Sequence, residues 1–165
     1  MASNVEVVAA RLREDSILVG GLGVNGWSGI LAGGVWTRRL KREPPGQTPE
    51  AFYASDKGRL IRPSAVVLDR GDVPHIQRDA IPSAYIQPIP IYLYAPATAS
   101  GKADIVAARK RVYYMLNGWR FTTEDGPVAF VEYRDRVGIL DSEEFVEAVY
   151  DTLRYEITSR LGHEV

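Results

Sequence analysis

The sequence predicts an α+β fold, in which a mostly antiparallel sheet of about four to five strands packs against a central helix and an N-terminal helix, with long loops. Two observations predict it. Residues 89–94 are apolar, β-branched and aromatic, which is typical of a strand. From residue 102 to residue 117 the apolar period changes from two to about 3.6, which indicates a helix. The apolar side chains of the strands on either side of this helix are expected to be buried against its apolar face.

Both expected helices have recognisable ends. The first is expected over residues 4–16, because Ser3 and Glu6 form a capping-box pattern ahead of apolar residues at helical spacing. The central helix ends at Asn117-Gly118, since glycine accepts the left-handed conformation that closes a helix. One face of the central helix is apolar and is expected to be buried, and it consists of Ile105, Ala108, Val112, Met115 and Leu116. The opposite face carries Ala103, Ala107, Lys110 and Tyr114.

Four segments have strand-like composition. Residues 60–68 and 85–94 are expected to pair as a long hairpin, joined by a polar loop over residues 70–83. A third strand is expected over residues 127–137, where apolar residues alternate. Residues 145–161 suit either a helix or a strand, and their density of Thr, Tyr, Val and Ile favours a strand antiparallel to the third.

The stretch 20–34 is rich in glycine, and residues 21–26 match the dinucleotide fingerprint G-x-G-x-x-G. That fingerprint requires a strand before it and a helix after it. Here a helix is expected before it and further glycines follow. The sequence therefore favours a loop anchored by Trp27 and Ile30, and no bound cofactor is expected.

Length and composition indicate one globular domain. The chain has 165 residues, of which 45% are hydrophobic and 25% charged, with a net charge of −1. A protein that holds nucleic acid on a broad basic surface is usually more positive. The sequence has no cysteine, which excludes disulfides and Cys-based metal sites. No apolar run approaches the roughly 20 residues of a membrane span, and the charged N-terminus does not suggest export.

A small basic cluster follows an expected short strand over residues 35–38. It consists of Arg38, Arg39, Lys41 and Arg42. Such clusters are usually solvated surface, and contact with nucleic acid is the more specific alternative.

The loop over residues 70–83 mixes apolar and charged side chains at the end of the predicted hairpin, and we interpret it as a docking arm. An ordinary solvated loop is the alternative. His75 lies near two aspartates, but their spacing matches no metal-ligand motif, and no catalytic motif occurs in the chain. We therefore predict no catalytic, cofactor-binding or metal-binding residues. The candidate interaction residues are Arg70, Asp72, Val73, His75, Ile76, Arg78, Asp79 and Ile81.

Four stretches carry a likeness to a known family. They are the helix over residues 5–12, the strand 89–94 with its following Ala-Pro, the helix 104–116 ending in Asn-Gly-Trp, and the final segment 149–157. In this order they resemble the tail terminator (tail completion) proteins of long-tailed bacteriophages. The likeness covers most of the chain as a single domain, 1–165, although the stretches 20–34 and 44–58 are longer than a minimal member needs.

The resemblance implies a structural virion protein that forms a homohexameric ring at the head-proximal end of the tail tube. The ring would end tube polymerisation and join the tail to the head. Its partners would be the tail tube protein, the head–tail connector protein and DNA that passes through the lumen without sequence-specific binding. The protein would lie in the virion tail or neck after assembly in the host cytoplasm.

Self-association is expected through open sheet edges beside Pro63, Pro88 and Pro90. Two other functions remain open. The first is another head–tail connector, neck or tube-like subunit. The second, which ranks last, is a small nucleotide-binding enzyme that uses the glycine-rich loop.

Overall fold

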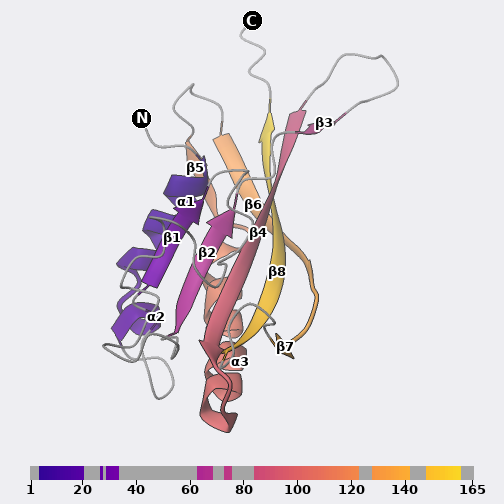
Figure 1. Cartoon of the computed structure of the whole chain (residues 1–165). Coiled ribbons are helices and arrows are strands. Elements are labelled where there is room, and N and C mark those ends of the chain that lie inside the picture. The colour runs from indigo at the N-terminus through magenta and orange to yellow at the C-terminus, as the bar shows by residue number, and fades with distance from the viewer. Residues whose placement is uncertain are drawn as a thin grey trace, which may run out of the picture.

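The computed structural model describes residues 4–20, 27, 29–33, 63–68, 73–75, 84–122, 128–141 and 148–160. Within them the chain forms three helices and an eight-stranded sheet (Figure 1). The helices are α1 (Asn4–Glu14), α2 (Ser16–Gly20) and α3 (Ala99–Leu116). The strands are β1 (Gly29–Gly33), β2 (Ser64–Leu68), β3 (Val73–His75), β4 (Ala84–Pro96), β5 (Arg120–Thr122), β6 (Val128–Arg136), β7 (Leu140–Asp141) and β8 (Ala148–Arg160).

The sheet has the strand order β1-β2-β4-β8-β6-β5, with β3 paired to β4 and β7 paired to β8. Only β1 and β2 are parallel, and every other pair is antiparallel. The predicted α+β class with a mostly antiparallel sheet is confirmed. More strands are present than predicted, because several are too short to show a period in the sequence.

The strands β4 and β8 form the centre of the sheet, paired without interruption from Ala84↔Arg160 to Pro96↔Ala148. The strand prediction for residues 145–161 is confirmed over the described residues, and its expected pairing with β6 is also observed. Side chains alternate between the two faces of this strand pair. Buried apolar residues at odd-numbered positions, such as Ile91 and Leu153, face the helices, whereas Tyr92 and Tyr94 belong to a separate cluster on the other face.

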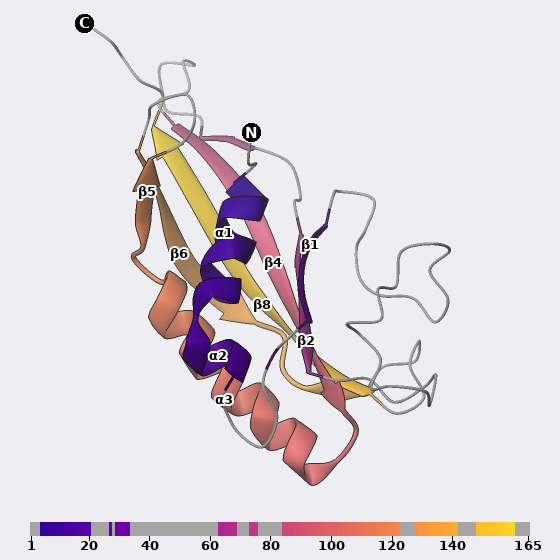
Figure 2. The ribbon, with the colours of Figure 1, turned by 90° about the vertical axis from the view of Figure 1, so that its left-hand side faces the viewer.

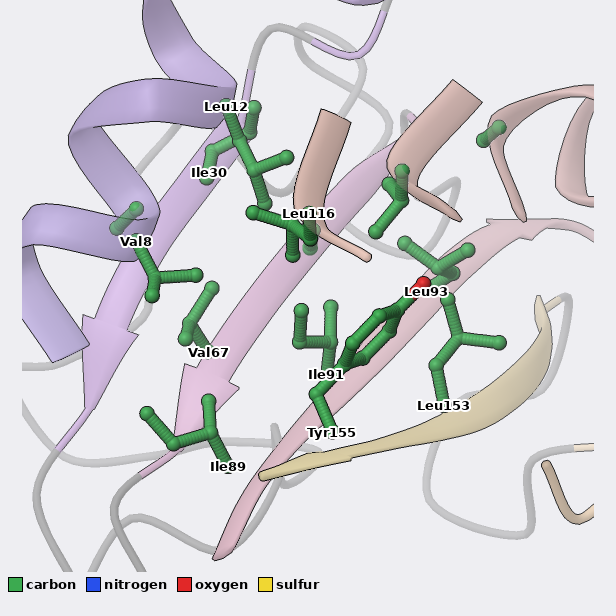
Figure 3. Close-up of a cluster of buried hydrophobic side chains, with 14 of the residues drawn as sticks. Val8, Leu12, Ile30, Val67, Ile89, Ile91, Leu93, Leu116, Leu153 and Tyr155 are labelled. Atoms are coloured by element: carbon green, nitrogen blue, oxygen red, sulfur yellow. The ribbon is translucent and has the colours of Figure 1, made fainter. Parts of the chain in front are cut away.

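The main core lies between the sheet and the helices, and α1 and α3 lie on the same side of the sheet (Figure 2). The predicted apolar face of α3 is confirmed, since its four core residues are fully buried and Met115 packs against them. Side chains from α1, α3 and four strands converge in Figure 3, among them Val8, Leu12, Ile30, Val67, Ile89, Ile91, Leu93, Leu116, Leu153 and Tyr155.

Helix α3 begins about one turn before the predicted residue 102. Thr98 is its N-cap, and the Thr98 hydroxyl accepts a hydrogen bond of 3.0 Å from the Gly101 backbone N–H. Gly101 therefore lies inside the first turn of the helix. Glycine is required there because a Cβ at this position would lie 1.9 Å from the Pro96 carbonyl oxygen. At the other end the helix is closed as predicted, with Gly118 at a φ of +80°.

The predicted helix over residues 4–16 is confirmed as α1 over Asn4–Glu14, and a second helix, α2, follows it without having been predicted. Asp15 separates the two, because the Asp15 carboxylate accepts a hydrogen bond from the Leu18 backbone N–H and so caps α2. The glycine-rich stretch was expected to be a loop throughout, which is wrong, since Gly29–Gly33 form β1 on the edge of β2. The two predicted anchors of this stretch are confirmed, because Trp27 and Ile30 are both buried in the core.

The predicted hairpin of residues 60–68 and 85–94 is confirmed, but its loop is shorter than expected. Val73–His75 form β3 and pair with β4, so this part of the predicted loop continues the hairpin. The register differs by one residue between the two strands that face β4: Val67 pairs with Ile91, whereas Val73 pairs with Ile86. This difference in register cannot be predicted from composition.

Open sheet edges were expected beside Pro63, Pro88 and Pro90, and this expectation is wrong. Pro63 directly precedes β2, which lies between β1 and β4. Pro88 and Pro90 lie in β4, which is a central strand. Among the described residues, the strands with a partner on one flank only are β1, β3, β5 and β7.

The strand β4 can be central because its two prolines face the same flank. Its ladder with β8 runs unbroken through Pro88 and Pro90, so the odd-numbered residues must donate hydrogen bonds to β8. The proline nitrogens then face the β2/β3 side. On that side the described pairing with β2 ends at Ile91 and the pairing with β3 begins at Ile86, so the prolines lie at the interruption.

Candidate interaction surfaces

The structure places only two of the predicted docking-arm residues, Val73 and His75, and puts both in β3. The pair His75↔Ala84 closes the hairpin, so residues 76–83 connect the two strands. This end of β4 projects past β2, on the same side as the end of β8 (Figure 1). The remaining predicted residues lie outside the described ones: Arg70, Asp72, Ile76, Arg78, Asp79 and Ile81.

The predicted basic cluster also lies outside the described residues, as does the expected strand over residues 35–38. It comprises Arg38, Arg39, Lys41 and Arg42. The dinucleotide pattern of residues 21–26 lies outside them too, but its neighbours are described. Helix α2 precedes it and strand β1 follows it, which is the reverse of the order that dinucleotide binding requires.

Two of the sheet edges are partly protected against the addition of another strand. Arg13 of α1 donates a hydrogen bond of 2.8 Å from Nε to the carbonyl oxygen of Ile30 in edge strand β1. Pro74 lies in edge strand β3 and has no backbone N–H to offer. At these two edges the addition of another strand is therefore disfavoured.

A groove with a volume of about 670 Å³ lies on the sheet face opposite the helices, and we call it the sheet groove. Its apolar side is formed by β4, through Pro88, Pro90 and Tyr92. Charged residues of β8 and of the end of β6 form the other side, together with Thr152 and Val137, and these charged residues are Arg134, Asp135, Arg154 and Glu156.

The charges of the sheet groove are paired across the strands. Arg134 Nε lies 2.7 Å from a Glu156 carboxylate oxygen, and Arg154 Nε lies 3.2 Å from an oxygen of Asp135. The hydrogen bond to Glu156 raises the pKa of Arg134. A register shift in β6 between Tyr133 and Asp135 produces this arrangement, because it brings Asp135 opposite Arg154.

Tyr92 connects the sheet groove to a second apolar cluster on the same face. Its ring stacks on Tyr94 with centroids 6.4 Å apart, and Tyr94 stacks on Tyr150 at 5.7 Å. Val66 and Leu68 of β2 and Ala148 of β8 complete this cluster. Tyr92 and Tyr94 are both buried, so they are packed residues of this face.

The solvent-facing side of α3 is cationic and aromatic, and we call it the helix face. It consists of Lys102, Arg109, Lys110, Tyr113 and Tyr114, of which Tyr114 is 74% exposed. The only acidic residue of α3, Asp104, is buried. The prediction that Lys110 and Tyr114 lie opposite the apolar face is confirmed.

The helices as a whole are cationic on their outer side. Across 4–20 and 99–122 there are seven Lys and Arg and four Asp and Glu. Two of the acids are in ion pairs, Glu6 with Arg13 and Asp15 with Arg111, and Asp104 is buried. Within these residues, five Lys and Arg remain outside the two ion pairs, and Glu14 is the one exposed acid that remains to balance them.

Two buried carboxylates, Asp15 and Asp151, have structural roles that the sequence did not reveal. Asp15 accepts hydrogen bonds of 2.7 and 2.8 Å from the Arg111 guanidinium, which holds the pKa of Asp15 below its usual value. Asp151 accepts a bond of 2.9 Å from the Gly138 backbone N–H and pairs with Arg136. In the part of the chain that the structure describes, no three His, Cys, Asp or Glu residues gather as a metal site would require.

No helix among the described residues combines the length and apolar character needed to cross a membrane. No family model matches the chain. A search of curated proteins found no match either. The surfaces above are therefore the observations from which a function can be proposed. The sheet groove was missed at the level of sequence, although alternating charges in residues 132–136 and 154–156 were a signal for it.

Proposed function

We propose that this chain is a structural virion protein that forms a ring at the head-proximal end of a phage tail tube. One observation carries the proposal. The four stretches that resemble tail terminator proteins belong to α1, β4, α3 and β8, and these elements share one hydrophobic core. The segments that carry the likeness thus belong to one packed unit and are not scattered over unrelated parts of the surface.

In this role the ring, which we take to be a hexamer, ends tube polymerisation and joins the tail to the head–tail connector. The tail tube protein and the connector protein bind its two sides. DNA passes through the lumen without sequence-specific binding. The projecting hairpin of β3 and β4 supports the proposal, because an element that reaches past the body of the sheet can contact a neighbouring ring.

Negative-stain electron microscopy of the purified protein, alone and with tails, tests the proposal. A closed ring, or a ring that forms only on tail ends, is the expected result. A continuous polymer would instead indicate a tube-like subunit, and a ring that binds heads but not tails would indicate another connector. A protein that stays monomeric on its own and with tails would overturn the proposal.

The docking arm has a test of its own, which the structure refines. Because Val73–His75 pair with β4, the deletion should spare them and replace residues 76–83 with a short Gly-Ser turn. On our proposal the melting temperature stays within a few degrees while tails are no longer joined to heads. Normal joining by this variant would show that the arm is only a connection.

A further inference from the structure

The helix face and the sheet groove lie on opposite sides of the same sheet. Figure 2 shows α1 and α3 in front of the sheet, and the sheet groove is on the face away from them. Two different surfaces on opposite sides of one subunit can meet only head to tail, with one copy presenting its helices and the next its sheet. Such heterologous contacts close into a ring when the rotation between copies allows it.

The helix face presents an aromatic side chain that is already held in position. The guanidinium of Arg111 lies 4.8 Å from the centre of the Tyr114 ring, and the same guanidinium is fixed by Asp15. A side chain held in this way loses less conformational entropy when it docks than a free one does. Lys110 lies one turn before Tyr114 on the same face and supplies a positive charge beside the ring.

The sheet groove offers complementary chemistry to such an aromatic and cationic surface. Pro88, Pro90 and Tyr92 form an apolar wall against which a tyrosine ring can pack. Two carboxylates and two arginines line the charged side as ion pairs, and a third carboxylate, Glu132, lies beside them, 3.8 Å from Arg134. The excess charge is therefore negative, opposite to that of the helix face.

We propose that the helix face of one copy, centred on Lys110 and Tyr114, docks into the sheet groove of the next copy. The inference rests on the proposed function in one respect, since both require self-association, and it adds which surfaces meet. A second copy explains both surfaces at once. A polyanion such as DNA would satisfy the helix face alone, and the carboxylates of the sheet groove would repel it.

Two variants test the proposal, each altering one surface with exposed residues. The helix variant is Lys110→Ser with Tyr114→Ser, and the groove variant is Glu132→Lys with Asp135→Lys. Glu14→Lys with Asp141→Lys is the matched control for the groove variant, because it also replaces two acids with two lysines, at exposed residues outside both surfaces. Circular dichroism and melting temperature establish that each variant is folded.

Sedimentation velocity over a range of concentrations, and microscopy on tail ends, measure assembly. Each test variant should need a protein concentration on the order of tenfold higher than wild type to assemble, as is typical when a central aromatic or charged contact is removed. The control should assemble like wild type. An equal mixture of the two test variants should stop at pairs of subunits, because each copy then has only one working surface.

Different results would contradict the proposal of a ring and the proposal of which surfaces meet in it. If wild type forms rings and either test variant does so equally well, the docking surfaces are wrong while the ring stands. If the helix variant assembles normally but loses salt-dependent binding to a short DNA duplex, the helix face binds nucleic acid and our assignment is overturned. If wild type does not assemble alone or on tails, both proposals are wrong.

Discussion

Replacing Gly101 with alanine should destabilise the protein, although it puts a better helix former into a helix. In an exposed helix the change would stabilise by about 1 kcal/mol. Here the new Cβ would lie 1.9 Å from the Pro96 carbonyl oxygen and 2.9 Å from its carbon, and ordinary contact begins at 3.4 Å. The start of α3 must therefore move by about 1.5 Å away from the end of β4.

That movement breaks identified contacts. The Thr98 backbone N–H donates to the same Pro96 oxygen at 2.8 Å, and the Thr98 hydroxyl caps Gly101. Losing the backbone bond and the cap costs about 1 kcal/mol each, and the strain of overpacking adds about 1–3 kcal/mol. After subtraction of the helix-propensity gain, we expect a loss of about 2–4 kcal/mol. For a chain of this size that lowers the melting temperature by very roughly 5–15 °C.

Urea unfolding followed by circular dichroism measures the effect, and Gly118→Ala is the matched control. Gly118 has a φ of +80° but nothing within 4 Å of a built Cβ, so alanine should cost only about 1 kcal/mol there. If Gly101→Ala stabilises the protein, or costs no more than the control, the close approach of α3 to Pro96 does not exist in solution.

Three further predictions follow from the buried polar groups and the cap. Tyr155→Phe should leave stability unchanged or raise it by up to about 1 kcal/mol in thermal melts. The reason is that the Tyr155 hydroxyl is buried without a hydrogen-bond partner among the described residues, and this burial raises the pKa of Tyr155. A clear loss of stability would show that the hydroxyl is hydrogen-bonded. Asp15→Asn should lower the urea midpoint at pH 7. Because Arg111 holds the pKa of Asp15 below 3.8, the difference from wild type should persist above that pH and shrink as the pH falls through the lower folded value; a difference independent of pH would contradict this. Thr98→Ala should cost about 1 kcal/mol and Thr98→Ser much less in the same assay, and equal losses would rule out the hydroxyl cap.

The elements that the sequence predicted are those whose own residues carry a period. Helix α3 could be predicted because four core residues recur at helical spacing, and β6 because its apolar residues alternate. Strands β4 and β8 could be predicted from their β-branched and aromatic composition. The short strand β1 could not be predicted, because glycine and alanine have low strand propensity and its partner β2 is far away in the sequence. Strand β3 contains a proline and exists through its pairing with β4.

The candidate surfaces were harder to predict, because they depend on residues far apart in the chain. Arg111 and Asp15 are 96 positions apart, and no local pattern connects them. The sheet groove depends on the register shift after Tyr133, which brings Asp135 beside Arg154. The exposed side of α3 was predictable, because the residues opposite an apolar helical face are solvent-exposed by geometry.

The two prolines of β4 have a consequence for how the chain avoids misfolding. If β4 slipped by one residue against β8, both proline nitrogens would turn toward β8 and two ladder hydrogen bonds could not form. The same slip would turn Ile89 and Ile91 out of the core. Pro88 and Pro90 therefore disfavour a one-residue misalignment through backbone hydrogen bonding, independently of side-chain packing. In a newly made chain, surrounded by identical copies with the same strands, every alignment of β4 and β8 that is displaced by an odd number of residues carries that loss.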